Sequence, residues 1–186
     1  MTEVENIPLP FDEVSFKPVT SETWEDFQAF FKPRLNYCWC MAWRMTGEEM
    51  KDNTAVCRRE FIKRRIFSGV PVGILGFIGD QTVAWCSVAP RETYRKLSGE
   101  EGLEEVWSIA CFYIRKEFRD QGVLSKMIEN AKVYARSNGA KYLEAYPVEA
   151  NSPSYRFMGF TGVFEKAGFK EVKMAGSRRH VMILPL

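Results

Sequence analysis

The chain has 186 residues, of which 46% are hydrophobic and 27% are charged. This length and composition are typical of one globular domain with a single core. The net charge of +2 gives no overall drive toward nucleic acid or a membrane surface. No apolar run approaches the ~20 residues of a membrane span, and the acidic N-terminus lacks the order of a secretory signal. We therefore expect a cytoplasmic protein with one domain over residues 1–186, in which residues 1–12 form a flexible N-terminal extension.

The first half of the chain predicts two helices and a hairpin. The expected elements are a strand at 14–19, a helix that stops before Pro33, an irregular aromatic and cysteine-rich segment at 34–47, a helix at 54–67, and hairpin strands at 72–78 and 81–89. Pro90 ends the second hairpin strand, and a polar excursion follows over residues 91–103. Tyr94 and Leu97 are the expected anchors of that excursion.

The most informative stretch runs from Val106 to Ser137. It predicts an apolar strand at 106–114, a basic turn at 115–121 and a helix that opens on Gly122. The helix keeps one buried face: Val123, Leu124, Met127, Ile128, Ala131, Tyr134 and Ala135. A strand that runs through a glycine turn into a helix points several backbone N–H groups at one place, which suits a phosphate or pyrophosphate.

The remainder predicts a strand at 141–146, a short helix at 162–167, and a final strand pair at 170–174 and 179–184. The whole order indicates one mixed α/β domain. The five cysteines are irregularly spaced and argue against a disulfide framework: Cys38, Cys40, Cys57, Cys86 and Cys111. Because His180 is the only histidine, histidine-based zinc or triad chemistry is nearly excluded, and we expect no metal.

Two motifs within this order resemble the GNAT (GCN5-related) N-acetyltransferase superfamily. They are Arg119-Asp-Gln-Gly122-Val-Leu124 and Phe164-Glu-Lys-Ala-Gly168-Phe169, and the resemblance covers residues 14–186. Four sequence segments more closely resemble a bacterial branch of this superfamily: Tyr37-Cys-Trp-Cys-Met41, Trp85-Cys-Ser-Val-Ala-Pro-Arg91, Val106-Trp-Ser-Ile-Ala-Cys-Phe112 and Glu144-Ala-Tyr-Pro147. The family implies a twisted, mostly antiparallel sheet, splayed between its fourth and fifth strands and flanked by helices. It also implies acetyl-CoA in the gap between those strands.

The resemblance assigns coenzyme A to the central strand and the turn after it. The family's loop pattern is Arg/Gln-x-x-Gly-x-Gly/Ala, which Arg119 and Gly122 match. Leu124 stands where a small residue is usual, and an inward-pointing side chain would leave its N–H available. The implied cofactor-binding residues are Phe112, Tyr113, Ile114, Arg119, Asp120, Gln121, Gly122, Val123, Leu124, Ser125, Lys126 and, after the fifth strand, Asn151.

The usual side-chain catalysts of the family are missing. Phe164 stands where many relatives have a tyrosine acid, and Ser108 and Ala110 stand where they have a Glu or His base. Acetyl transfer to an amine still needs a neutral nucleophile, a polarised carbonyl and a proton for the leaving thiolate. The family suggests direct attack in a ternary complex, with a backbone N–H near Phe112 or Tyr113 facing the carbonyl oxygen.

The remaining candidates for acid–base work lie beside the central strand. We predict a water relay through Ser108 and Glu144, with Tyr146 or Tyr155 as the acid. Glu104 and Glu105 are further candidates for the base. A role as plain sheet residues remains an equal alternative for Glu144 and Tyr146.

The segment Tyr37-Cys-Trp-Cys-Met-Ala-Trp43 has several interpretations. Cys38 and Cys40 are too closely spaced for the usual Cys-x-x-Cys metal grip, and a Cys-x-Cys disulfide would be strained. An aromatic wall under the acceptor site suits the segment better, with core packing as the alternative. In that interpretation Trp39, Trp43 and Trp85 form an apolar or cation-binding substrate pocket.

The second predicted helix carries a basic face: Arg58, Arg59, Lys63, Arg64 and Arg65. A solvated face explains these residues more simply than an acidic acceptor or RNA. The expected partners are therefore acetyl-CoA and an amine acceptor, without membrane or nucleic acid; a homodimer, common among relatives, stays open. Two rival hypotheses are an acyltransferase that uses a longer acyl donor and a GNAT-fold protein that senses coenzyme A without turnover. The second hypothesis stays open because Phe164, Ser108 and Ala110 replace the usual catalytic residues.

Overall fold

The structure, a computed structural model, describes residues 14–32 and 38–186. The predicted extension at 1–12 and Tyr37 of the aromatic segment lie outside these residues. Within them the chain forms one seven-stranded sheet in the order β1-β2-β3-β4-β5-β7-β6. The strands are β1 Val14–Pro18, β2 Ile74–Ile78, β3 Gln81–Pro90, β4 Val106–Ile114, β5 Tyr142–Ala145, β6 Lys170–Ala175 and β7 Arg179–Pro185.

Four α-helices flank the sheet within the same described ranges. They are α1 Trp24–Phe31, α2 Ala55–Phe67, α3 Val123–Ser137 and α4 Thr161–Lys166. The predicted mixed α/β fold and its element order are confirmed, with strand and helix bounds that differ by at most two residues. Four short 3-10 helices in the described residues were not expected from the sequence: Glu49–Asp52, Arg91–Thr93, Lys116–Phe118 and Arg156–Met158.

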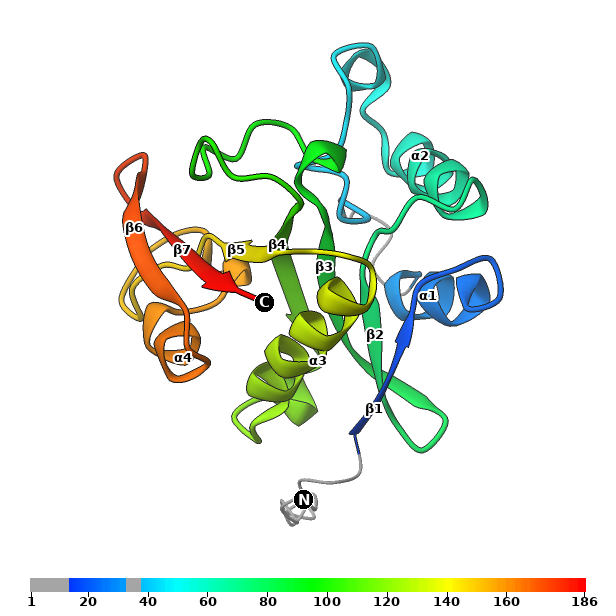
Figure 1. The fold of residues 1–186 in the computed structure, drawn as a ribbon. Coiled ribbons are helices and arrows are strands. Elements are labelled where there is room, and N and C mark those ends of the chain that lie inside the picture. Colours follow the sequence, from blue (N-terminus) through cyan, green and yellow to red (C-terminus); the bar gives the residue numbers. More distant parts are fainter. Residues whose placement is uncertain (1–13, 33–37) are drawn as a thin grey trace.

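The sheet is antiparallel except where β4 and β5 run side by side in parallel. That parallel pairing begins at Val106↔Tyr142 and ends at Ile109↔Ala145, although β4 continues to Ile114. The two strands therefore diverge about halfway along β4. Figure 1 shows the result, with β5, β7 and β6 to the left of β4 and the earlier strands to its right. The predicted splay between the fourth and fifth strands follows from this register.

The two faces of β3 carry two different helical layers. Ala84 and Cys86 belong to the core cluster under α3, whereas Trp85 between them belongs to the cluster under α1 and α2. Successive residues of a strand point to opposite faces, so the near-continuous apolar run of β3 is buried on both sides. In Figure 1, α3 crosses the centre of the sheet while α1 and α2 lie together on its right.

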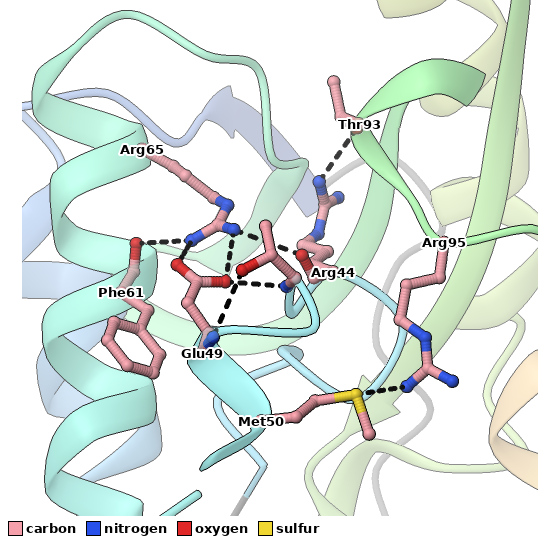
Figure 2. Close-up of polar contacts among 8 residues, drawn as sticks. Arg44, Glu49, Met50, Phe61, Arg65, Thr93 and Arg95 are labelled. Carbon is pink, nitrogen blue, oxygen red and sulfur yellow. Dashed lines mark hydrogen bonds and ion pairs between the residues drawn. The ribbon is translucent and has the colours of Figure 1, made fainter. Parts of the chain in front are cut away.

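The chain between α1 and α2 is tied down by polar contacts. Thr46 and Glu49 form a reciprocal capping box: the Thr46 N–H donates to Glu49 Oε2 at 2.9 Å, and the Glu49 N–H donates to Thr46 Oγ1 at 3.2 Å. Arg65 of α2 donates to both oxygens of Glu49, at 2.9 and 2.7 Å, and to the carbonyl oxygen of Arg44 at 3.1 Å (Figure 2). These bonds fasten the segment around Arg44 and Glu49 to α2.

The predicted anchors of the excursion after β3 are both buried. Tyr94 is 8% exposed and Leu97 is 3% exposed. The Arg95 N–H also donates to the Trp43 carbonyl oxygen at 2.7 Å, so the excursion is fastened to the aromatic segment. In the described part of the chain, no helix is long and apolar enough to cross a membrane.

Candidate active site

The central strand β4 carries an extra residue at the point where β5 leaves it. Ile109 pairs with Val88 and Cys111 pairs with Ser87, so Ala110 is left without a partner on β3. On the other side, the pairing of β4 with β5 ends at Ile109. A bulge of this kind re-aims the neighbouring groups of a strand and is frequent beside active sites. Within the described residues, the rest of β4 therefore has an edge that faces no paired strand.

A buried carboxylate lies at the apex where the two strands part. Glu144 of β5 has no exposed surface and accepts a hydrogen bond from Ser108 Oγ of β4 at 2.6 Å. It also accepts one from the Tyr146 hydroxyl. Arg91 completes the group, donating from Nε to Glu144 Oε1 at 2.9 Å and from Nη2 to Oε2. The structure thus brings together three of the four predicted catalytic residues and adds Arg91.

The protonation states in this network follow from its geometry. Both carboxylate oxygens of Glu144 face Arg91, so the guanidinium compensates the negative charge. Burial raises the pKa of Tyr146, and the neighbouring Glu144 charge raises it further, which keeps the phenol protonated. The Tyr146 proton is directed at Glu144 rather than at open space. The arrangement is therefore suited to holding the two strands together at this point.

A cavity of about 350 Å³ adjoins the bulge. Its wall is mostly aromatic and sulfur-containing: Phe31, Cys38, Cys40, Ala42, Trp43, Ser87, Tyr94, Ala110, Cys111, Phe112, Tyr113 and Phe157. Four consecutive residues of β4 take part, so the cavity runs along the strand at the bulge. Its size is that of a small-molecule site. Ser108, Glu144 and Tyr146 are not among the wall residues.

The turn after β4 has the backbone geometry of an anion site. Gly122 caps α3 with φ +77°, and Asp120 two residues earlier has φ +59°. The left-handed φ of Gly122 favours glycine, and alternating backbone conformations of this kind gather N–H groups into a concave nest. The first turn of α3 contains no acidic residue. Leu124 is half-buried and packs against the core cluster under α3, which is the inward direction expected from the sequence.

Of the three tryptophans predicted to form the substrate pocket, only Trp43 lies in the cavity wall. Trp39 is 4% exposed and Trp85 is fully buried, and both belong to the core cluster under α1 and α2. The Trp85 indole N–H donates to Cys40 Sγ at 2.7 Å, and its ring lies 5.1 Å from that of Phe27. Trp39 and Trp85 therefore take the core-packing alternative, and the alternation of β3 directs Trp85 into that core.

The other predicted site residues lie outside the buried network. Tyr155 is 36% exposed, and its ring is 5.5 Å from the Arg179 guanidinium. Asn151 is exposed in the turn after β5. Phe164 is fully buried, with its ring 6.1 Å from that of Phe112, so the residue at the usual tyrosine position serves as core.

Several residues of the site were missed at the sequence level. Arg91 and Gly99 meet Glu144 only through the return of the chain after β3. Arg44 had a visible signal, because it is a lone charge in an apolar, aromatic segment. Its guanidinium donates to Val72 O, Ser87 Oγ and Tyr94 Oη at 2.8, 3.1 and 2.5 Å.

Three of the cysteines lie in the cavity wall as free thiols: Cys38, Cys40 and Cys111. Hydrogen bonding with Cys111 and burial raise the pKa of Cys40, so its thiol stays protonated at neutral pH. Across residues 14–32 and 38–186, no group of three or more His, Cys, Asp or Glu side chains is arranged to hold a metal ion. The thiols therefore contribute soft apolar surface to the cavity.

Known proteins resemble this chain in both sequence pattern and fold. The model of the acetyltransferase (GNAT) family matches residues 16–169. No curated protein matches the chain. Solved structures with a similar fold include an acetyltransferase from Thermus thermophilus, with 16% identity, a TM-score of 0.56, and coverage of 93% of this chain and 97% of that one.

Two further structures carry more specific names. One is the PaiA N-acetyltransferase from Thermoplasma acidophilum in complex with coenzyme A, with 13% identity, a TM-score of 0.55, and coverage of 93% of this chain and 99% of that one. The other is a ribosomal-protein-alanine N-acetyltransferase from Brucella melitensis, with 16% identity, a TM-score of 0.56, and coverage of 92% and 99%. At these identities the likeness shows the fold, while the family model covers most of the sequence. The chain belongs to the GNAT acetyltransferase family.

Proposed function

We propose that this protein is an acetyl-CoA-dependent N-acetyltransferase that acts on the primary amine of a small molecule or peptide. The observation that carries the proposal is the course of β4. Its unpaired edge begins at the bulge beside the cavity and leads to the Gly122 turn at the start of α3. One continuous path thus joins a phosphate-type backbone nest to an apolar cavity.

The residues along this path fit the parts of coenzyme A. The backbone N–H groups at the start of α3, from Val123 to Ser125, would meet the pyrophosphate. Arg119 and Lys126 would add positive charge, and the edge of β4 at Phe112 and Ile114 would pair with the pantetheine amides. Asp120, Gln121 and Tyr113 would contribute through the backbone. Acetyl-CoA supplies an activated thioester when bound, so positioning can carry much of the catalysis.

The coenzyme A in the Thermoplasma structure supports this proposal by analogy of fold. Asn151 is the weakest of the predicted cofactor residues, because it is exposed in a turn after β5. Asn151 stays a candidate for contact with the solvent-exposed part of coenzyme A.

The chain's own contribution to transfer would be orientation and exclusion of water. The bulge at Ala110 frees backbone on β4 next to the cavity, where an N–H near Phe112 or Tyr113 would face the carbonyl oxygen. Glu144, with Ser108, Tyr146 and Arg91, would act as a positioning group that keeps β4 and β5 apart at the correct place. In the water relay predicted from the sequence, the same carboxylate is the base; the charge compensation by Arg91 favours the positioning role. Tyr155 remains the proposed acid nearest the cavity mouth, since its neighbour Phe157 lines the wall.

A coenzyme A-binding protein without turnover is the second candidate. The observation in its favour is that the cavity wall contains no Asp, Glu, Lys or Arg among its described members, and that Phe164 is core. Such a protein would bind the cofactor in the same path and use the cavity for a regulatory ligand or not at all.

Calorimetric titration with acetyl-CoA and desulfo-coenzyme A, followed by an assay of thiol release with a panel of amines, separates the candidates. Binding of both ligands with amine-dependent release supports the transferase. Binding without release from any amine favours the non-catalytic protein. Absence of binding to either ligand overturns both.

A further inference from the structure

Among the residues that the structure describes, the cavity beside the bulge has no counter-charge for an ammonium group. Its described wall contains six aromatic rings, three cysteines, two alanines and one serine, but no carboxylate. An alkylamine is protonated at neutral pH and would have to leave water for this wall. Burying an unpaired charge costs several kcal/mol. The wall alone therefore disfavours a cationic acceptor.

A buried cation adjoins one side of the wall. Arg44 is 3% exposed, and two of its hydrogen-bond acceptors, Ser87 and Tyr94, are wall residues. A further contact, from Nη1 to Thr93 Oγ1 at 3.1 Å, is drawn in Figure 2. None of the ion pairs among the described residues includes Arg44, and its Nε has no partner there. Among residues 14–32 and 38–186, no carboxylate therefore neutralises the positive charge of Arg44 beside the cavity.

A second guanidinium already occupies the aromatic faces at the other side. Arg179 lies 5.1 Å from the ring centroid of Trp43, 5.5 Å from that of Tyr155 and 5.8 Å from that of Tyr146. Trp43 is a wall residue. The cation–π position on one wall ring, that of Trp43, is thus filled by the protein itself.

The nearest buried carboxylate does not change this balance. Glu144 is compensated by Arg91 and stands outside the described wall. Hydrogen bonding and burial raise the pKa values of the Cys38 and Cys40 thiols, so neither thiol is a base for an incoming ammonium. An acceptor would have to arrive uncharged.

We infer that the acceptor site selects a weakly basic aromatic amine, an arylamine, over alkylamines and lysine side chains. This inference rests on the proposed transferase function. An arylamine is uncharged at neutral pH because its nitrogen lone pair is delocalised into the ring, and its flat face matches a wall of Phe, Trp and Tyr. The transfer forms one N–C bond and breaks one C–S bond, and the proton that the nitrogen loses ends on the sulfur of the coenzyme.

The test uses two amines with the same ring, 4-methylaniline and 4-methylbenzylamine, at neutral pH. The first is neutral and the second is an ammonium ion. Binding to the full chain is measured by ligand-observed NMR, and transfer by release of coenzyme A thiol. We expect the aniline to bind and react at least about tenfold better, since the alkylammonium must be desolvated without a partner. Equal or better binding of the benzylamine overturns the inference.

A matched pair of variants locates the effect. Phe157 is 43% exposed and lines the cavity, whereas Phe67 is 55% exposed on α2, away from the wall. Phe157→Ala should weaken binding of 4-methylaniline, and Phe67→Ala should leave it unchanged. Equal effects of the two substitutions would place the amine elsewhere and overturn the inference.

The two hypotheses fail in different ways. Acetylation of the benzylamine, with no binding or reaction of the aniline, would sink the inference and leave the transferase function standing. Preferential binding of the aniline without acetylation of either amine would support the selectivity of the cavity and count against the transferase.

Discussion

Arg91 donates to both carboxylate oxygens of Glu144, from Nε to one and from Nη2 to the other. The two residues come from opposite sides of β4: Arg91 follows β3, and Glu144 lies within β5. Ser108 of β4 reaches the same carboxylate, so three neighbouring segments meet at one buried charge. The group stands immediately before the last β4–β5 pair, Ile109↔Ala145. The buried charge therefore lies at the point at which the sheet opens.

The first prediction concerns this carboxylate. Glu144→Gln should lower the free energy of unfolding by about 3–5 kcal/mol, because Arg91 loses its buried counter-charge. Transfer should slow, while affinity for acetyl-CoA stays within about twofold, a change worth under 1 kcal/mol. The pH–rate profile should keep its shape, because a positioning residue contributes no ionisation. Urea denaturation, calorimetry and rates across pH measure these effects.

The exposed neighbour of Arg91 offers a control for that substitution. Glu92 lies in the same 3-10 helix and is exposed, so Glu92→Gln should change none of the three quantities. Loss of the acidic limb of the pH profile in Glu144→Gln would identify Glu144 as the general base and contradict the positioning role.

The second prediction concerns Gly99, which packs against the same group. A Cβ added there would lie 2.3 Å from Glu144 Oε2 and 2.6 Å from the Tyr146 hydroxyl oxygen. Gly99→Ala should therefore destabilise the protein by about 1–3 kcal/mol through overpacking. Gly47 has open space around its Cβ position, so Gly47→Ala should have little effect. If the two variants unfold at comparable temperatures, the segment that carries Gly99 can move aside without disturbing the hydrogen bonds of Glu144, and the prediction is wrong.

The third prediction concerns the cofactor turn. Gly122→Glu should abolish binding of coenzyme A, because a carboxylate at the start of α3 both fills and repels the pyrophosphate position. Gly69, at the end of α2, has φ +78°, nearly the same as Gly122 at +77°. Gly69→Glu therefore carries matched backbone strain and charge without touching the turn. Calorimetric titration of folded variants is the measurement, and intact affinity in Gly122→Glu would refute the proposed cofactor path.

The fourth prediction concerns alkaline stability. Burial raises the pKa of Cys86 above its ordinary value of 9.0, and the pKa values of Tyr94 and Tyr146 above 10.0. The unfolded chain releases these protons first, so the folded state binds more protons in this range. The free energy of unfolding should therefore be fully maintained below the ordinary values and fall as pH rises above them. Urea denaturation at a series of pH values between about 8 and 11 follows this range of ordinary pKa values.

A variant separates the contribution of one buried phenol. Tyr94→Phe removes a titrating group and also one acceptor of Arg44. It should lower stability at neutral pH by about 1–3 kcal/mol and make the alkaline decline less steep. An unchanged slope would mean that Tyr94 ionises as readily in the folded protein as in the unfolded chain.

The sequence alone determined the element order and the central strand–turn–helix. Apolar periodicity, glycine at Gly122 and the Asn138-Gly139 stop are local signals, because helix faces, caps and left-handed turns are decided within a few residues. The family motifs use the same local geometry, so the fold class was predictable. The grouping of Ser108, Glu144 and Tyr146 could also be predicted, because β4 and β5 are neighbours and Tyr146 directly follows β5.

Only the tertiary structure decided what those groups do. Arg91, directly after β3, and Gly99, in the excursion that follows, meet Glu144 only in the folded protein, and no spacing in the sequence encodes that meeting. The same holds for Trp85, which the alternation of β3 directs into the core, and for Arg44, whose acceptors lie on three separate segments. Burial and charge compensation are properties of contacts between distant residues, so the roles of these side chains follow from packing rather than from local pattern.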